Sequence, residues 1–378
     1  MGLSLESIRA GFPVLEHTAY LDTATTGPFH RRIHAAAIRC FDQRLNGGLD
    51  MPGYKEWVRL TDEARSDIAS VINARPEEIA YTKNASEGMN IAAHILPLTP
   101  GDNVIVPDLS FPSNSYVFMN LQKKGVEVKW ARSSGGVVPF DEISRLVDGR
   151  TRAISVCHVE FASGFTHNLE MIGALCREKN IYFHVDCTQS IMALRIDVRA
   201  ANIDMMSAAV YKWPCCPLGV GFFFCSERIL EGLAPESAVG WFGMTDRWDM
   251  PQPPSDIPLS KTAGRFETGS PNFAGVFAMT EAARIYEELG PQFIEERILH
   301  LNAYLADRLL SAGVEVVGPF EEGNRSGILY ARFPNEAETA EALRKNKVQV
   351  NTGHGKARIA THYFNTEEDI DRLVEALK

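Results

Sequence analysis

The chain has 378 residues, 45% of them hydrophobic and 23% charged, as is ordinary for a globular protein. This length exceeds the usual size of one domain, so we expect a large domain and a smaller companion. The net charge of -10 disfavours nucleic acid and acidic membrane surfaces as partners, because it provides no basic face.

The seven cysteines follow no framework spacing, and no CxxC or Cys/His cluster suggests a bound metal. The first residues lack the pattern of a secretory signal, and no apolar run is long enough to span a bilayer. We therefore expect a cytoplasmic protein with no metal site and no membrane contact, whose cysteines are mostly small core residues.

From residue 78 to residue 224, short apolar runs alternate with helical patterns. Strands are predicted at 78–82, 103–107, 126–131, 151–159, 181–186, 204–210 and 219–224, and helices at 85–96, 113–125 and 169–180. This alternation predicts an α/β fold with a mainly parallel sheet and helices on both faces. Ligands of such sheets bind beyond the carboxyl ends of the strands, where Asn84, Phe111, His158, Asp186 and Lys212 fall.

Two long helical patterns follow, at about 273–289 and 291–312, and then a small alternating unit. The final helix is predicted to begin at Asn365, because Glu368 three residues later completes a capping box. We divide the chain into an N-terminal segment (1–20), a large domain (21–265) and a smaller C-terminal α+β domain (266–378).

Two strand-end residues carry candidate chemistry. Asp186 ends one apolar strand, and Lys212 ends another 26 residues later. A buried structural Asp–Lys pair is one interpretation. The other is pyridoxal phosphate, which needs a lysine for a Schiff base and an acid to keep its ring nitrogen protonated.

The other requirements of pyridoxal phosphate also have candidates. Ser86 stands at the start of a helix, where backbone N–H groups favour a phosphate. Phe111 is placed to stack on one face of the ring, and Thr188 to pack on the other. Gln189 is a candidate to bind the phenolic oxygen, and Tyr211 to bind the phosphate.

The chain resembles the class V aminotransferase superfamily in six stretches that occur in register. They are "TKNASEGMNIA", "HVEFASGFTHNL", "HVDCTQS", "YKWPCCPLGVGFFF", "RFETGSPNFAG" and "ARIATHYFNTEEDIDRLVEAL". The resemblance extends from about residue 20 to residue 377 and implies pyridoxal phosphate fold type I. The superfamily includes cysteine desulfurases, isopenicillin N epimerase-like proteins, kynureninases and some transaminases.

The resemblance implies a role for several residues of the large domain. Lys212 matches the Schiff-base lysine, and Asp186 matches the partner of the ring nitrogen. Gln189 matches the residue that contacts O3' of the cofactor. Ala85 and Ser86 match the pair that cups the phosphate, Ala85 through its backbone alone.

The resemblance also implies partners beyond the cofactor. Ser270 matches a hydroxyl residue that reaches the phosphate of a neighbouring subunit, which implies a homodimer with shared sites. Arg358 matches the arginine that holds the α-carboxylate of an amino-acid substrate. Thr25 and His158 are further candidates for substrate contact.

Departures from the family pattern bear on the reaction. Desulfurases that pass sulfur on as a persulfide carry a cysteine shortly before the carboxylate-binding arginine, whereas here "VNTGHGKARIA" is short and contains none. Tyr211 replaces a frequent histidine, and "YKW" looks more like the epimerase and kynureninase branches. Cys215 and Cys216 are expected to pack, and His354 is either an active-site residue or an ordinary loop histidine.

The best-supported activity is β-elimination, as by a C–S lyase similar to cysteine desulfurases but without a relay cysteine. It would act at the α-carbon of a small amino acid through Lys212. The alternative is an amino-acid epimerase or aminotransferase, and a more remote one is a non-catalytic binding protein on the same fold.

Overall fold

The computed structural model describes residues 5–232, 239–249, 256–318, 321, 323–333 and 335–377. A seven-stranded sheet forms its centre, with strand order β2-β8-β7-β6-β5-β3-β4. The strands are β2 (Ile79–Thr82), β3 (Asn103–Pro107), β4 (Glu127–Ala131), β5 (Thr151–Cys157), β6 (Tyr182–Asp186), β7 (Met205–Ala209) and β8 (Gly221–Cys225). Strands β3 to β7 are parallel and β8 runs antiparallel to both neighbours, which confirms the predicted mainly parallel sheet.

Helices cover both faces of this sheet because its buried strands are apolar on both sides. Val104 and Val106 of β3 belong to one core with α5 (Ala85–Ile95) and α6 (Pro112–Leu121). Ile105 between them belongs to the other core, with α4 (Arg65–Ser70), α7 (Phe140–Leu146) and α8 (Leu169–Lys179). The short helix α9 (Glu227–Gly232) follows β8 on the first of these faces.

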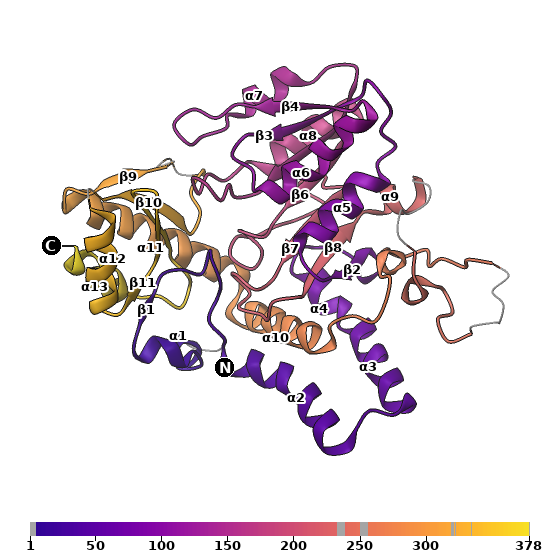
Figure 1. Ribbon diagram of the computed structural model, residues 1–378, viewed down its shortest axis with the longest axis horizontal. Coiled ribbons are helices and arrows are strands. Elements are labelled where there is room, and N and C mark those ends of the chain that lie inside the picture. The colour runs from indigo at the N-terminus through magenta and orange to yellow at the C-terminus, as the bar shows by residue number, and fades with distance from the viewer. Residues whose placement is uncertain are drawn as a thin grey trace.

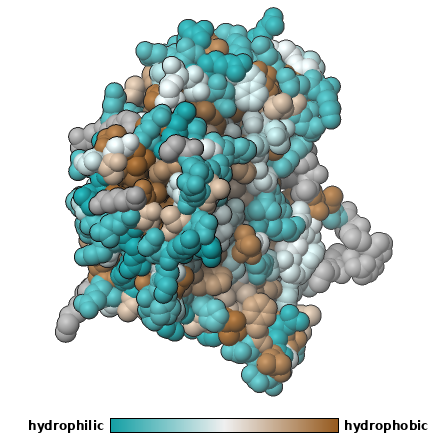
Figure 2. Space-filling view, turned by 60° about the vertical axis from the view of Figure 1, so that its left-hand side comes forward, coloured by the Kyte–Doolittle hydropathy of each residue, from teal (hydrophilic) through white to brown (hydrophobic). Residues whose placement is uncertain are grey.

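The N-terminal part of the chain joins both regions of the molecule. It contains α1 (Leu5–Arg9), β1 (Ala19–Tyr20), α2 (Arg31–Gly47) and α3 (Met51–Glu63). Helix α10 (Phe273–Leu289) lies alongside α2 beneath the large sheet (Figure 1), and its buried side chains share that sheet's core. Helices α2 and α3 project from the body as an α2–α3 arm, and apolar side chains are exposed at the lower end of the view in Figure 2.

The C-terminal part lies to one side of the large sheet, drawn in orange and yellow in Figure 1. Its sheet has the order β12-β13-β10-β9 and is antiparallel. The elements are α11 (Pro291–Ser311), β9 (Glu315–Val317), β10 (Ile328–Arg332), α12 (Glu336–Lys345), β11 (Val348–Gln349), β12 (Asn351–Gly353), β13 (Lys356–Ala360) and α13 (Glu367–Ala376). Strand β1 pairs in parallel with β11, so the start of the chain is attached to this part.

One local prediction is wrong by a residue. The N-cap of α13 is Thr366, and its capping box is completed by Asp369 rather than by the predicted Asn365 and Glu368. Asn365 instead donates its amide to the carbonyl of Tyr20, at 2.9 Å. Among the described helices, none is both long and apolar enough to cross a membrane.

Candidate active site

A cavity opens at the carboxyl ends of β5, β6 and β7, around Lys212. Eight residues predicted to bind a cofactor line it: Ala85, Ser86, Phe111, Asp186, Thr188, Gln189, Tyr211 and Lys212. Residues that the sequence did not single out also line it, among them Ser113, Cys157 and Phe161. The parallel strands bring these positions together because they all end at one edge of the sheet.

Lys212 is buried, and no hydrogen bond or ion pair links its Nζ to another residue in the described part of the chain. The pKa of this amine is lowered to about 8, because burial and the charge of Arg358 lower it by more than the charge of Asp186 raises it. Nζ lies 5.6 Å from the centre of the Phe111 ring and 5.7 Å from that of Tyr211. The site therefore holds an uncommitted amine that is partly neutral near physiological pH.

Asp186 ends β6 and is buried beneath the cavity. Its Oδ1 accepts the backbone N–H of Thr188 at 2.9 Å, and its Oδ2 accepts the thiol of Cys157 at 3.6 Å. Burial raises the pKa of Asp186, while these hydrogen bonds and the charge of Lys212 oppose that rise. A carboxyl group in this setting is suited to pair with a cationic ring nitrogen.

Neighbouring groups orient the other polar residues of the cavity. The Gln189 amide donates to the carbonyl of Ala24 at 3.1 Å and accepts the indole N–H of Trp213 at 3.0 Å. The hydroxyl of Thr188 accepts the backbone N–H of Ala209 at 3.3 Å. These bonds fix both side chains at the cavity wall.

Helix α5 points its N-terminus at the cavity. The first turn of any helix has N–H groups without helical acceptors, and Asn84 satisfies only that of Glu87. Ser86 and Ser113 add two hydroxyl groups, which lie 2.8 Å apart. Ser113 stands in the first turn of α6, and this position is a sequence signal too common to identify it as a site residue.

Arg358 on β13 faces the segment 22–26 rather than lining the cavity wall. Its guanidinium donates to the hydroxyl of Thr25, which also accepts the amide of Asn351 at 3.1 Å. Asp22 Oδ1 lies 3.9 Å from the guanidinium. Buried atoms Asp22 Oδ1 and Arg358 Nε form no hydrogen bond with the described residues, so this corner retains capacity to bind a polar ligand.

Close backbone packing attaches the segment 22–27 to the turn that contains Lys212. Gly27 donates its N–H to the carbonyl of Tyr211 at 2.9 Å. A Cβ atom at Gly27 would lie 2.1 Å from the carbonyl oxygen of Lys212, so only glycine fits there. Thr25, a candidate for substrate contact, and Arg358, the candidate for carboxylate binding, are thereby held beside Lys212.

Two further predicted site residues, besides Arg358 and Thr25, lie away from the cavity wall. His158 is buried, and burial lowers the pKa of its imidazole to about 3, so that it stays neutral. Ser270 is exposed and its hydroxyl lies 2.6 Å from that of Tyr54. It lines a different cavity of about 290 Å³, next to Thr82.

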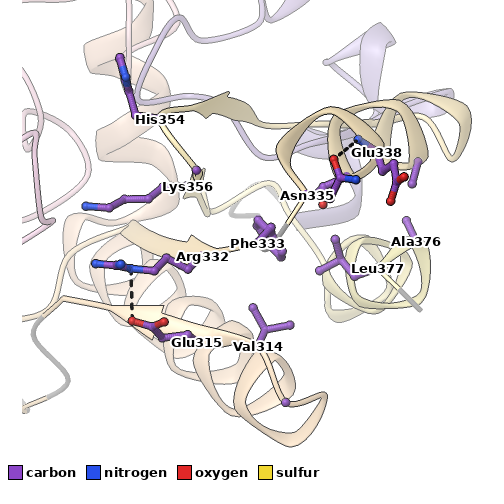
Figure 3. Close-up of a pocket in the computed structure, with 14 residues that line it drawn as sticks. Val314, Glu315, Arg332, Phe333, Asn335, Glu338, His354, Lys356, Ala376 and Leu377 are labelled. Carbon is purple, nitrogen blue, oxygen red and sulfur yellow. Dashed lines mark hydrogen bonds and ion pairs between the residues drawn. The ribbon is translucent and has the colours of Figure 1, made fainter.

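A larger cavity of about 740 Å³ lies in the C-terminal part and includes His354 (Figure 3). Its wall includes Lys356 and Arg332, the latter paired with Glu315 at 3.2 Å, and none of the residues of the Lys212 cavity. His354 thus belongs to this second cavity. Cys215 and Cys216 are buried in the core, and burial raises the pKa of both thiols.

The chemistry of the Lys212 cavity fits pyridoxal phosphate. It presents a free amine, a buried acid, a helix N-terminus with hydroxyl groups and an aromatic ring in Phe111. Each of these matches one chemical feature of the cofactor, namely its aldehyde, ring nitrogen, phosphate and ring face.

Comparisons with known proteins agree with this chemistry. The family model described as Aminotransferase class-V matches residues 19–373. The chain is 30% identical to a probable cysteine desulfurase of Methanothermobacter thermautotrophicus, over 99% of this chain and 97% of that one.

Two solved structures show the same fold. The apo cysteine desulfurase of Thermococcus onnurineus NA1 has a TM-score of 0.89 at 21% identity, over 99% of this chain and 98% of that one. A cystine C–S lyase in complex with its reaction product cysteine persulfide has a TM-score of 0.87 at 19% identity, over 97% of this chain and 98% of the other. With the family match, they lead to one conclusion: the chain belongs to the class-V aminotransferase family and is a pyridoxal phosphate-dependent enzyme of fold type I.

Proposed function

We propose that this enzyme is a C–S lyase that removes a sulfur-bearing group from the β-carbon of a small L-amino acid. The observation that carries the proposal is the buried amine of Lys212. The charges of Asp186 and Arg358 both act on its pKa, so the base, the acid and the arginine belong to one site. The relative from Methanothermobacter is named a probable cysteine desulfurase, and a neighbour of the same fold is named a cystine C–S lyase.

Residues of the cavity would hold the cofactor by complementary chemistry. Asp186 would bind its ring nitrogen, the start of α5 with Ser86 its phosphate, and Phe111 and Thr188 its two faces. When bound, pyridoxal phosphate supplies an electron sink for the charge that develops at the α-carbon of an amino acid.

Lys212 and Arg358 would act on the substrate itself. The planar guanidinium of Arg358 binds a carboxylate by two parallel hydrogen bonds, and the Thr25 hydroxyl already contacts it. With a pKa of about 8, the amine of Lys212 is available in part as a neutral base to take the α-proton at Nζ. Elimination is complete when the Cβ–S bond breaks and its electron pair leaves with the sulfur.

The hairpin that carries Arg358 supports a reaction without a relay cysteine. Gly353 pairs with Lys356, so only His354 and Gly355 connect β12 to β13. Both have positive φ, at 55° and 72°, which makes a tight turn with no room for a mobile loop. All seven cysteines are buried, and none lies on this hairpin.

A second candidate is epimerisation or transamination of an amino acid. The observation in its favour is Tyr211, whose ring lines the cavity beside Lys212 and adds another proton-bearing group. We also propose a cytoplasmic location, because no disulfide links any of the seven cysteines, and a homodimer in which Ser270 reaches the neighbouring phosphate.

The test is to incubate the holoenzyme with L- and D-cysteine, cystine, cysteine sulfinate and alanine, and to follow the products. We expect sulfide or persulfide together with pyruvate from cysteine or cystine, at a rate that iodoacetamide pretreatment leaves within twofold. Lys212→Ala is expected to lower this rate by at least a thousandfold, because it removes the base and the covalent attachment.

Other products would identify another reaction. If alanine is the product and iodoacetamide pretreatment abolishes the activity, the enzyme uses a relay thiol and the proposal is contradicted. Inversion of the α-carbon, or conversion of the cofactor to its amine form without sulfide, would establish the second candidate.

A further inference from the structure

Cys157 lines the Lys212 cavity next to Asp186. These residues end the neighbouring parallel strands β5 and β6 and are paired in register. The thiol of Cys157 donates to Oδ2 of Asp186 at 3.6 Å, and its sulfur accepts the backbone N–H of Phe111 at 3.4 Å. The thiol is therefore held between the loop of Phe111 and the buried acid.

A second layer of buried polar groups lies behind this thiol. Ser110 donates its hydroxyl to Oε1 of Glu160 at 3.4 Å, and the imidazole of His167 contacts the same oxygen at 2.9 Å. Glu160 has no exposed surface, and its Oε2 has no hydrogen-bond partner among the described residues. The side chain of Ser110 also lies within hydrogen-bonding reach of the Cys157 thiol, so polar side chains connect Asp186 through Cys157 and Ser110 to the Glu160–His167 pair.

These surroundings keep Cys157 protonated. Burial raises the pKa of its thiol well above the ordinary value, and the carboxyl groups of Asp186 and Glu160 raise it further. A thiol that stays protonated is a poor nucleophile but a lasting hydrogen-bond donor. Its acceptor in this site is the carboxylate of Asp186.

We propose that Cys157 is a positioning residue for the cofactor: its S–H group holds the Asp186 carboxylate in the orientation and charge state that the ring nitrogen requires. A buried carboxylate is costly unless hydrogen bonds compensate for the lost water. Thr188, through its N–H and its side chain, and the thiol of Cys157 supply such bonds to Asp186, and Cys157 is the donor on Oδ2. The inference rests on the cofactor and not on which reaction the enzyme catalyses.

The test compares Cys157→Ala and Cys157→Val, which both remove the donor, with Cys157→Ser, which keeps one. Valine leaves no cavity, so a loss shared by the two donor-free variants reports the hydrogen bond rather than packing. We expect both to weaken the binding of pyridoxal phosphate to the apoenzyme by about tenfold, and Cys157→Ser to stay within about threefold of the wild type. Cys176→Ala, at a buried thiol on α8 remote from Asp186, is the matched control.

The second readout is the nitrogen-15 chemical shift of ring-labelled pyridoxal phosphate bound to each variant, which reports whether the ring nitrogen is protonated. We expect this shift to move toward the unprotonated value in the alanine and valine variants, and to be unchanged in the serine variant and in Cys176→Ala. The proposal is overturned if either donor-free variant that folds keeps the wild-type shift and affinity. It is equally overturned if the serine variant loses both as the alanine variant does. Neither measurement uses turnover, so the result is independent of the reaction proposed above.

Discussion

At the scale of single residues, the buried amine of Lys212 reduces the stability of the fold. Burial lowers its pKa from 10.5 to about 8, so a proton binds less tightly in the folded chain than in the unfolded one. A shift of this size corresponds to about 3 kcal/mol of unfolding free energy. The cost is fully present below about pH 8 and disappears as the pH rises from 8 to 10.5, because stability increases wherever the unfolded state binds more protons.

We therefore expect Lys212→Met to stabilise the cofactor-free protein by about 2 kcal/mol at pH 7, with a gain that shrinks toward pH 10.5. Urea unfolding at pH 7, 8.5 and 10 measures this difference. Lys129→Met is the control, because the Lys129 ammonium is paired with Asp148 at 2.7 Å and its loss is expected to bring no gain. A less stable Lys212→Met protein at pH 7 would contradict the argument.

The chemistry of individual residues decided which of them could be predicted. Lys212 and Asp186 were identifiable because burying a lysine or a carboxylate at the end of a strand costs free energy, which a pairing or a functional role explains. Cys157 and Ser113 were not, because a buried thiol and a helix-start serine are common in proteins without any site. Their importance follows from the pairing of β5 with β6 and from the approach of α6 to α5, which the sequence does not state.

At the scale of elements, the start of α13 shows how tertiary contacts select between two adequate caps. Thr366 accepts the N–H of Asp369 at 3.3 Å, and the Asp369 carboxylate accepts the N–H of Thr366 at 3.1 Å. Asn365 is fully buried, where its amide donates to Tyr20 and accepts the N–H of His362. Since both residue types cap helices well, the sequence could predict the helix but not which of the two begins it.

Substitutions at Thr366 and Asn365 distinguish the cap of α13 from the buried contact that Asn365 makes with Tyr20. We expect Thr366→Ala to cost about 1 kcal/mol of unfolding free energy, the usual value of a lost cap. Asn365→Ala is expected to cost about 2 to 3 kcal/mol, because it leaves buried backbone groups of Tyr20 and His362 without partners. Urea unfolding of the two variants is the measurement, and an equal or reversed order would show that Asn365 is not the structural link between the chain ends.

At the scale of the whole molecule, the reversed strand β8 has a simple cause. Only residues 210–220 connect β7 to β8, and they form the turn that contains Lys212 rather than a helix. A parallel return needs a crossover of about a dozen or more residues, usually helical, so the chain turns back antiparallel. The pairing of β1 with β11 had no such local signal, because Ala19 and Val348 are brought together only by the folded C-terminal part.

The α2–α3 arm bears on the assembly of the molecule. Phe41, Leu45 and Met51 on this arm are 58%, 81% and 61% exposed, which is unusual for large apolar side chains grouped on one projection. A second copy of the chain is the occupant that the proposed homodimer requires, and the position of Ser270 outside the Lys212 cavity agrees with a role across subunits. Burying this surface would stabilise such a dimer by the hydrophobic effect.

We expect the double variant Phe41→Glu, Leu45→Glu to sediment as a monomer at micromolar concentration, because two charges would be buried without partners. Its affinity for pyridoxal phosphate should fall at least tenfold with the loss of the neighbour's Ser270. Ser270→Ala alone should weaken cofactor binding while the protein still sediments as the wild type does. Leu310→Glu, which alters a 54% exposed leucine on α11, is the control and should change neither property. A monomeric wild type, or a double variant that dissociates while retaining full cofactor affinity, would show that the site is complete within one chain.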